Sequence, residues 1–153
     1  MSLGDFWIVD SGGEAPKSHT YAVYAGTAAS IKAGDLVTKD GSNQGYVKVA
    51  VDGGSSSLVW VGVAATTSTD TATADGVVDV FDSVTNVIRG YATTSSNLAR
   101  SLVFTQVTLD VTSSVQTIDE NDTSSGTFII VGYDTNDGTV DFRLATNDHI
   151  TAG

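Results

Sequence analysis

The chain has 153 residues, enough for one domain with a core of its own, and its 41% apolar residues argue against general disorder. It contains no cysteine, which excludes disulfides, thiol nucleophiles and zinc–thiolate sites, and its 18 acidic and 7 basic residues give a net charge of −11. This charge repels phosphate backbones and anionic lipids, and no apolar stretch approaches the ~20 residues of a membrane-spanning helix, so we expect neither nucleic acid nor a membrane as a partner.

The first 19 residues differ from the rest of the chain. Phe6, Trp7, Ile8 and Val9 form an apolar cluster in a glycine-containing segment that lacks the features of a signal peptide, so we expect a soluble protein made in a cytoplasm. The cluster either begins the protein's own core as a first strand or belongs to an arm that docks on another subunit. We predict the arm, and these four residues as its partner-binding residues.

From residue 20 onward the dominant signal is β-structure. Short runs of Val, Ile, Thr and Tyr are separated by clusters of Gly, Asp, Asn and Ser, as in a succession of strands and turns. The run from 58 to 65 is apolar on both faces, which is typical of a strand buried on both sides and predicts Trp60 in the core. Asn136-Asp137-Gly138 predicts a hairpin. The predicted strands are Thr20–Ala25, Asp35–Lys39, Tyr46–Val51, Leu58–Ala65, Val77–Asp82, Val87–Thr93, Leu102–Thr112, Val115–Asp119, Thr127–Asp134 and Thr139–Thr146.

Few segments favour anything other than strand. Ser95–Arg100 is the one helical candidate, a turn or two with a serine as N-cap and Leu98 facing inward. Ala65–Asp75, rich in Thr, Ser and Ala, is predicted to be an exposed loop. The acidic group Asp119–Asp122 is predicted to be a solvated loop.

The fold class that follows is all-β. We expect a compact body of short antiparallel strands, like a β-barrel or sandwich, with an extended N-terminal arm and at most one short helix. The arm covers residues 1–19, and a single β-rich domain covers residues 20–153. Within that domain, residues 20–93 form a core unit and residues 101–146 an additional β layer.

The run Asp10-Ser11-Gly12-Gly13 matches two enzyme motifs. It matches the nucleophile segment of chymotrypsin-like proteases, but these need their His and Asp before the serine, and no histidine precedes Ser11. It also matches the Asp-Ser-Gly of a homodimeric aspartic peptidase, which would make Asp10 catalytic, although little chain precedes it. A glycine-rich turn is the simpler interpretation, and we predict that the protein is not an enzyme.

Metal and cofactor motifs fit no better. Asp134–Gly138 lacks the glycine and glutamate positions of an EF-hand, although weak calcium binding there or at Asp119–Asp122 stays open. The two histidines, His19 and His149, lie far apart in the sequence without a neighbouring ligand. We therefore predict no cofactor and no metal site.

Three runs carry a resemblance to a known family. Ile31–Val37 reads Ile-Lys-Ala-Gly-Asp-Leu-Val, Trp60–Ala65 reads Trp-Val-Gly-Val-Ala-Ala, and Asp75–Phe81 reads Asp-Gly-Val-Val-Asp-Val-Phe. Their order over residues 20–92 resembles the head decoration, or cement, proteins of tailed bacteriophages. The segment 101–146 has no such match.

The resemblance implies a structural virion protein. Such a protein binds the outside of a phage capsid and stabilises it by clamping neighbouring major capsid subunits. The expected partners are the major capsid protein and sister copies in a homotrimer, with the N-terminal segment reaching the capsid. The alternative is a head-fibre, tail-fibre or surface adhesin module that binds host glycan, which exposed aromatic side chains would favour.

Overall fold

The computed structural model describes residues 3–26, 30–51, 59–123 and 126–144, and its fold is all-β, as predicted. Two short 3-10 helices, η1 (Ser95–Asn97) and η2 (Arg100–Leu102), are the only helical elements of these residues. The strands are β1 (Trp7–Asp10), β2 (Ser18–Val23), β3 (Leu36–Lys39), β4 (Val47–Val49), β5 (Trp60–Ala64), β6 (Gly76–Phe81), β7 (Val87–Tyr91), β8 (Gln106–Thr112), β9 (Val115–Asp119), β10 (Phe128–Asp134) and β11 (Thr139–Leu144).

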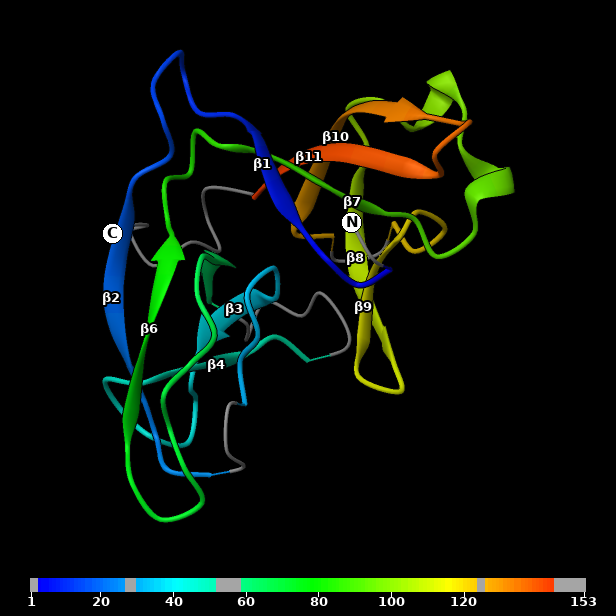
Figure 1. Ribbon diagram of the computed structural model, residues 1–153. Helices are drawn as coiled ribbons and strands as arrows, with labels where there is room; N and C mark the ends of the chain where they lie inside the picture. Colours follow the sequence, from blue (N-terminus) through cyan, green and yellow to red (C-terminus); the bar gives the residue numbers. More distant parts are fainter. Residues whose placement is uncertain (1–2, 27–29, 52–58, 124–125, 145–153) are drawn as a thin grey trace.

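Strands β2 to β6 close into a small barrel in the order β2-β4-β3-β5-β6 (Figure 1). Alternation along β6 turns Val78 and Val80 into the barrel and leaves Val77 exposed. Valines therefore dominate the barrel interior. The buried members of this cluster are Val23, Ile31, Val37, Val47, Val61, Ala64, Val78 and Val80.

The other strands form a six-stranded antiparallel sheet in the order β1-β7-β11-β10-β8-β9. The edge strand β9 approaches the second strand in this order, β7, because Ala92, just after β7, forms a bridge with Ile118 of β9. The predicted hairpin is confirmed: β10 and β11 pair across a turn in which Gly138 has a φ of 72° and Asp134 accepts the backbone N–H of Asn136.

The barrel and the sheet share one core. Trp60 of β5 is 0% exposed, as predicted for a core residue, and its ring lies 4.7 Å from that of Phe128 in β10. Gln116 of β9 joins the two units by hydrogen bonds. Its Oε1 accepts from the backbone N–H of Leu36 at 2.8 Å, and its Nε2 donates to the carbonyls of Leu36 and Ala50. The outer surface of β3 and β5 is thus buried against the sheet.

The boundary between the two units differs from the expected one. Strand β7, which was expected in the core unit at 20–93, pairs with β1 and β11 of the six-stranded sheet. The barrel itself spans β2 to β6. The periodicity of a strand indicates its buried face, but not which sheet it joins.

Two predicted solvated loops bury polar side chains. Ser68 and Asp70 are 5% and 2% exposed, and Asp70 accepts the hydroxyls of Ser68 and Ser30. Glu120 is 1% exposed, and its carboxylate accepts the side-chain amide of Asn97 at 2.9 Å. The predictions of full exposure were therefore wrong at these residues, since hydrogen bonds offset the desolvation of their polar groups.

Two further predicted segments differ from the structure in their bounds. The helical candidate at 95–100 is divided between η1 and η2, with Leu98 buried between them as expected. The strand predicted from Leu102 begins at Gln106, after a tight turn. The ends of two predicted strands lie outside the described residues: Leu58, the first residue of one, and residues 145–146, the last of the other. His149 also lies outside them.

Candidate functional site

The apolar N-terminal cluster lies within the chain's own sheet. Trp7 to Asp10 form edge strand β1, which pairs with β7. Phe6 is 2% exposed and meets the ring of Phe142 edge-on, with centroids 5.8 Å apart. It also lies against Gly90, where an added Cβ would be 2.2 Å from the Phe6 ring. The surface that covers Phe6 therefore belongs to this chain, and the segment expected to be an extended arm is the first strand.

The other three residues predicted to bind a partner are more accessible. Ile8 is half-buried against the shared core. Trp7 is half-buried on the opposite face, where its ring meets Tyr91 with centroids 6.2 Å apart. Val9 is 38% exposed. Trp7 and Val9 are the members of the cluster that a partner can still reach.

The Asp10 motif forms a turn. Asp10 is exposed at the end of β1, and its Oδ1 accepts the backbone N–H of Gly12 at 2.9 Å. Gly12 and Gly13 have φ values of 82° and 89°, which glycine adopts without strain. The glycine-rich turn is the interpretation that fits this geometry.

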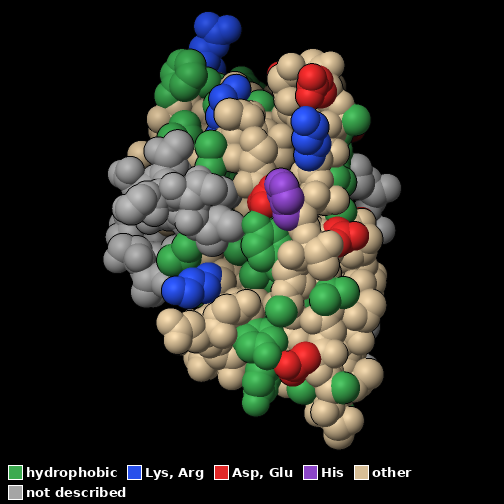
Figure 2. Space-filling model, turned by 90° about the vertical axis from the view of Figure 1, so that its left-hand side faces the viewer, with side chains coloured by type: hydrophobic (Ala, Val, Ile, Leu, Met, Phe, Trp, Pro, Cys, Tyr) green, Lys and Arg blue, Asp and Glu red, His purple; other side chains and the backbone are tan. Residues whose placement is uncertain are grey.

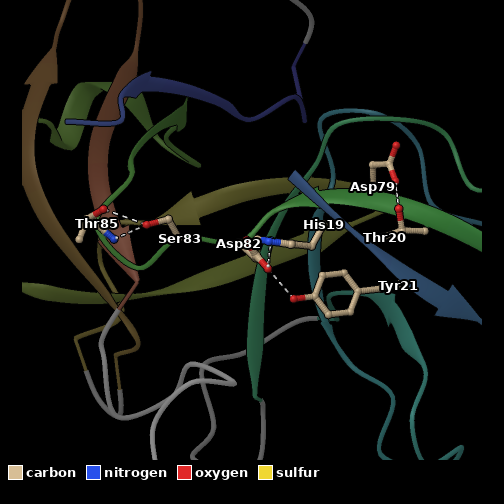
Figure 3. Close-up of polar contacts among 7 residues, drawn as sticks. All are labelled: His19, Thr20, Tyr21, Asp79, Asp82, Ser83 and Thr85. Atoms are coloured by element: carbon tan, nitrogen blue, oxygen red, sulfur yellow. Dashed lines mark hydrogen bonds and ion pairs between the residues drawn. The ribbon is translucent and has the colours of Figure 1, made fainter. Parts of the chain in front are cut away.

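A histidine–carboxylate pair joins β2 to the end of β6 (Figure 3). His19 Nδ1 lies 2.9 Å from Asp82 Oδ1, and the Tyr21 hydroxyl donates to Asp82 Oδ2 at 2.5 Å. Burial raises the pKa of Tyr21, and the hydrogen bond to Asp82 and its charge raise it further. The Ser83 hydroxyl lies on the other side of Asp82 and shares a hydrogen bond with Thr85, so it is not aligned with the imidazole of His19. The pair therefore lacks the geometry of a nucleophilic triad.

Sequence reasoning missed this pair because the partners are 63 positions apart. The pairing of β2 with β6 brings His19 opposite Val80 and so close to Asp82. The surrounding face of the barrel shows mainly backbone, uncharged polar side chains and groups of apolar side chains, and its acidic and basic side chains are few (Figure 2). Among the described residues, no three His, Asp or Glu side chains gather closely enough to hold a metal ion.

An exposed aromatic pair marks one end of the barrel. The rings of Tyr24 and Tyr46 meet edge-on with centroids 5.3 Å apart, and Tyr24 is 48% exposed. The Tyr46 hydroxyl donates to Asp75 at 2.7 Å, and the backbone N–H of Ala25 donates to the same carboxylate at 2.8 Å. The hydrogen bond from Tyr46, followed by that from Ala25, lowers the pKa of Asp75.

A second exposed aromatic lies on the sheet unit, in the turn between η2 and β8. Phe104 is 80% exposed, the largest exposed fraction among the exposed apolar residues that the structure describes. An open depression of about 550 Å³ lies beside it, lined by Arg100, Val103, Phe104, Gly132 and Tyr133. Tyr133 is itself 37% exposed. We call these five residues the Phe104 surface.

No helix in the described ranges is long and apolar enough to cross a membrane. The chain was also compared with protein-family models, with curated proteins and with solved structures, and none of the three comparisons found a match.

Proposed function

We propose that this chain is a structural virion protein that binds the outside of a tailed-phage capsid and clamps neighbouring major capsid subunits. The observation that carries the proposal is the placement of exposed aromatic side chains on both units of one body. Tyr24 lies on the barrel and Phe104 on the sheet unit. A clamp needs two separate contact surfaces, and exposed aromatic side chains are the usual centres of protein interfaces.

The connection between the two units supports this role. A clamp transmits force only if its contact surfaces cannot move independently. Here the barrel and the sheet share a core that contains Trp60 and Phe128, and Gln116 bonds the sheet to the barrel backbone. Burial of apolar area across this boundary opposes separation of the units.

The resemblance supplies the class of partner. The runs that resemble phage head decoration proteins form the barrel strands β3, β5 and β6 and the segments that lead into them. In this proposal the protein assembles as a homotrimer on the virion exterior and acts through contacts rather than chemistry.

Binding to capsids tests the proposal directly. Purified protein is mixed with capsids of the phage that encodes it, prepared without this protein, and the mixture is sedimented. We expect saturable co-sedimentation and a higher capsid melting temperature in the presence of the protein. If the capsids neither bind the protein nor gain thermal stability, the proposed function is refuted.

The alternative, a module that binds host glycan, is favoured by the Tyr24–Tyr46 pair. Two phenol rings with a carboxylate beside them offer both an apolar surface and hydrogen-bond acceptors to a sugar. Glycan-array binding that is lost in Tyr24→Ala, together with no affinity for capsids, would replace the capsid proposal with this one.

A further inference from the structure

The backbone at Phe104 adopts a conformation that its residue type disfavours. The N–H of Thr105 donates to the carbonyl of Leu102, which closes a four-residue turn, and Val103 has φ −63° and ψ 131°. Phe104 follows with a φ of 70°. These angles are those of a type II turn, whose third position normally requires glycine or asparagine because a Cβ is crowded there.

Hydrogen bonds to the neighbouring strand β10 hold Phe104 in this strained conformation. The N–H of Phe104 donates to the carbonyl of Ile130 in β10 at 2.7 Å, and the N–H of Ile130 donates to the carbonyl of Thr105 at 3.1 Å. The hydroxyl of Thr105 also donates to the carbonyl of Leu102 at 2.6 Å. These bonds fix the direction of the Phe104 side chain, so that the ring projects from the surface at 80% exposure. Both the backbone and the exposed ring are unfavourable for the isolated protein.

A positive charge lies beside the exposed ring. Arg100 is exposed at the start of η2, lines the same depression, and forms no ion pair with any residue that the structure describes. Among the described residues Arg143 also has no ion pair, so what distinguishes Arg100 is its place beside the exposed ring. An acidic group on a partner would complement Arg100.

We propose that the Phe104 surface is the site through which the sheet unit docks on the major capsid protein, with the Phe104 ring inserted into an apolar pocket of that subunit and an acidic side chain of the pocket rim facing Arg100. This inference rests on the proposed function and identifies its contact surface. It also assigns the contact to a surface other than the N-terminal cluster, of which the fold covers Phe6.

A protein pocket suits this surface better than a sugar does. Phenylalanine brings no hydrogen-bonding group, and a ring that projects at 80% exposure is desolvated only by a concave partner that surrounds it. An aromatic ring next to arginine is also the composition in which interface hot spots are enriched.

The test measures capsid affinity and stability in the same variants. Phe104→Ala and Arg100→Glu are each expected to weaken co-sedimentation with capsids at least tenfold, whereas Lys39→Glu, the same charge change on the barrel, leaves it unchanged. Phe104→Gly is expected to lose capsid binding and yet raise the urea midpoint of the isolated protein, because glycine relieves the left-handed backbone. Ser114→Gly is the matched control: Ser114 has a φ of 65° in the β8–β9 turn, so this change raises the midpoint without affecting binding.

Each outcome has a distinct meaning. If the unaltered protein binds capsids and Phe104→Ala binds equally well, the inference is overturned while the proposed function stands. If the unaltered protein binds no capsid, the proposed function and this inference fail together, and glycan binding that is sensitive to Phe104→Ala would assign the surface to a sugar. If Phe104→Gly lowers the urea midpoint, the strain on which the inference rests is absent.

Discussion

Replacing Phe6 by alanine tests whether the N-terminal segment is part of the protein's own core. The side chain is 2% exposed, and aromatic side chains bury about 150–250 Å² on folding. At about 25 cal/mol per Å², the burial of the whole side chain stabilises the fold by about 4–6 kcal/mol. Alanine keeps only the Cβ and leaves a cavity against Phe142, so we expect Phe6→Ala to lower the free energy of unfolding by about 3–5 kcal/mol.

The measurement is urea unfolding followed by tryptophan fluorescence, with the slope of the transition checked for two-state behaviour. Val9→Ala is the control, because Val9 is on the same strand and 38% exposed, and it should change the free energy of unfolding by less than about 0.5 kcal/mol. A loss of less than about 1 kcal/mol in Phe6→Ala would show that the segment is an arm after all.

A double-mutant cycle sharpens the test. Gly90→Ala places a Cβ 2.2 Å from the Phe6 ring and should be strongly destabilising in the unaltered protein. In the Phe6→Ala background the ring is absent, so the added methyl group should cost less. Additive effects of the two substitutions would mean that Phe6 does not lie on Gly90 in solution.

The other predictions concern the shared core and the barrel end. Trp60→Ala should lower the free energy of unfolding by about 3–5 kcal/mol, whereas Trp60→Phe should lower it less, because the buried Nε1 of Trp60 has no hydrogen-bond partner; equal losses in urea unfolding would contradict this. Gln116→Leu should cost about 2–4 kcal/mol in the same assay, because the N–H of Leu36 and the carbonyl of Ala50 lose the side chain that they bond, whereas the carbonyl of Leu36 keeps its bond from the N–H of Ala50; a neutral effect would show that the two units do not depend on this side chain. Tyr46→Phe should raise the pKa of Asp75 toward its ordinary value of 3.8 in an NMR titration, whereas Tyr24→Phe should leave it unchanged. Since folding lowers this pKa, Asp75 contributes stability above its ordinary pKa that is lost as the pH falls through the folded-state value, and Tyr46→Phe should reduce that loss.

The sequence predicted the fold class because hydrophobic alternation is a local signal. Strand β11 alternates Val140, Phe142 and Leu144 toward the core, and all three are buried. Trp60 was predicted correctly because its run is apolar on both faces, and β5 proves to be a barrel wall that is covered by the sheet. The N-terminal cluster was harder, because an apolar run predicts burial without saying whether the same chain or another covers it.

The Phe104 surface could not be predicted from the sequence, because its defining feature is the positive φ of Phe104. Val103, Phe104 and Thr105 have high strand propensity, so they were included in a strand. Turns with positive φ are recognised in sequences by glycine or asparagine, and neither occurs there. The β8–β9 hairpin also has positive φ values without glycine or asparagine, because Ser113 and Ser114 adopt φ values of 52° and 65°. At Phe104, the hydrogen bond from its N–H to the carbonyl of Ile130 in β10 supports this conformation.

The path of the chain through the two units favours folding of the barrel before the N-terminal strand joins the sheet. The chain leaves the sheet after β1, builds the whole barrel, and re-enters the sheet at β7 (Figure 1). Ser18, at the start of β2, pairs with Phe81, at the end of β6, so the closed barrel brings the two connecting segments together. Before the barrel forms, pairing of β1 with β7 must close a long loop at a high entropic cost, and afterwards the loop is short. During synthesis β1 emerges before the barrel strands, and we predict that it joins the sheet only after the barrel has closed, with Phe6 exposed to solvent until then.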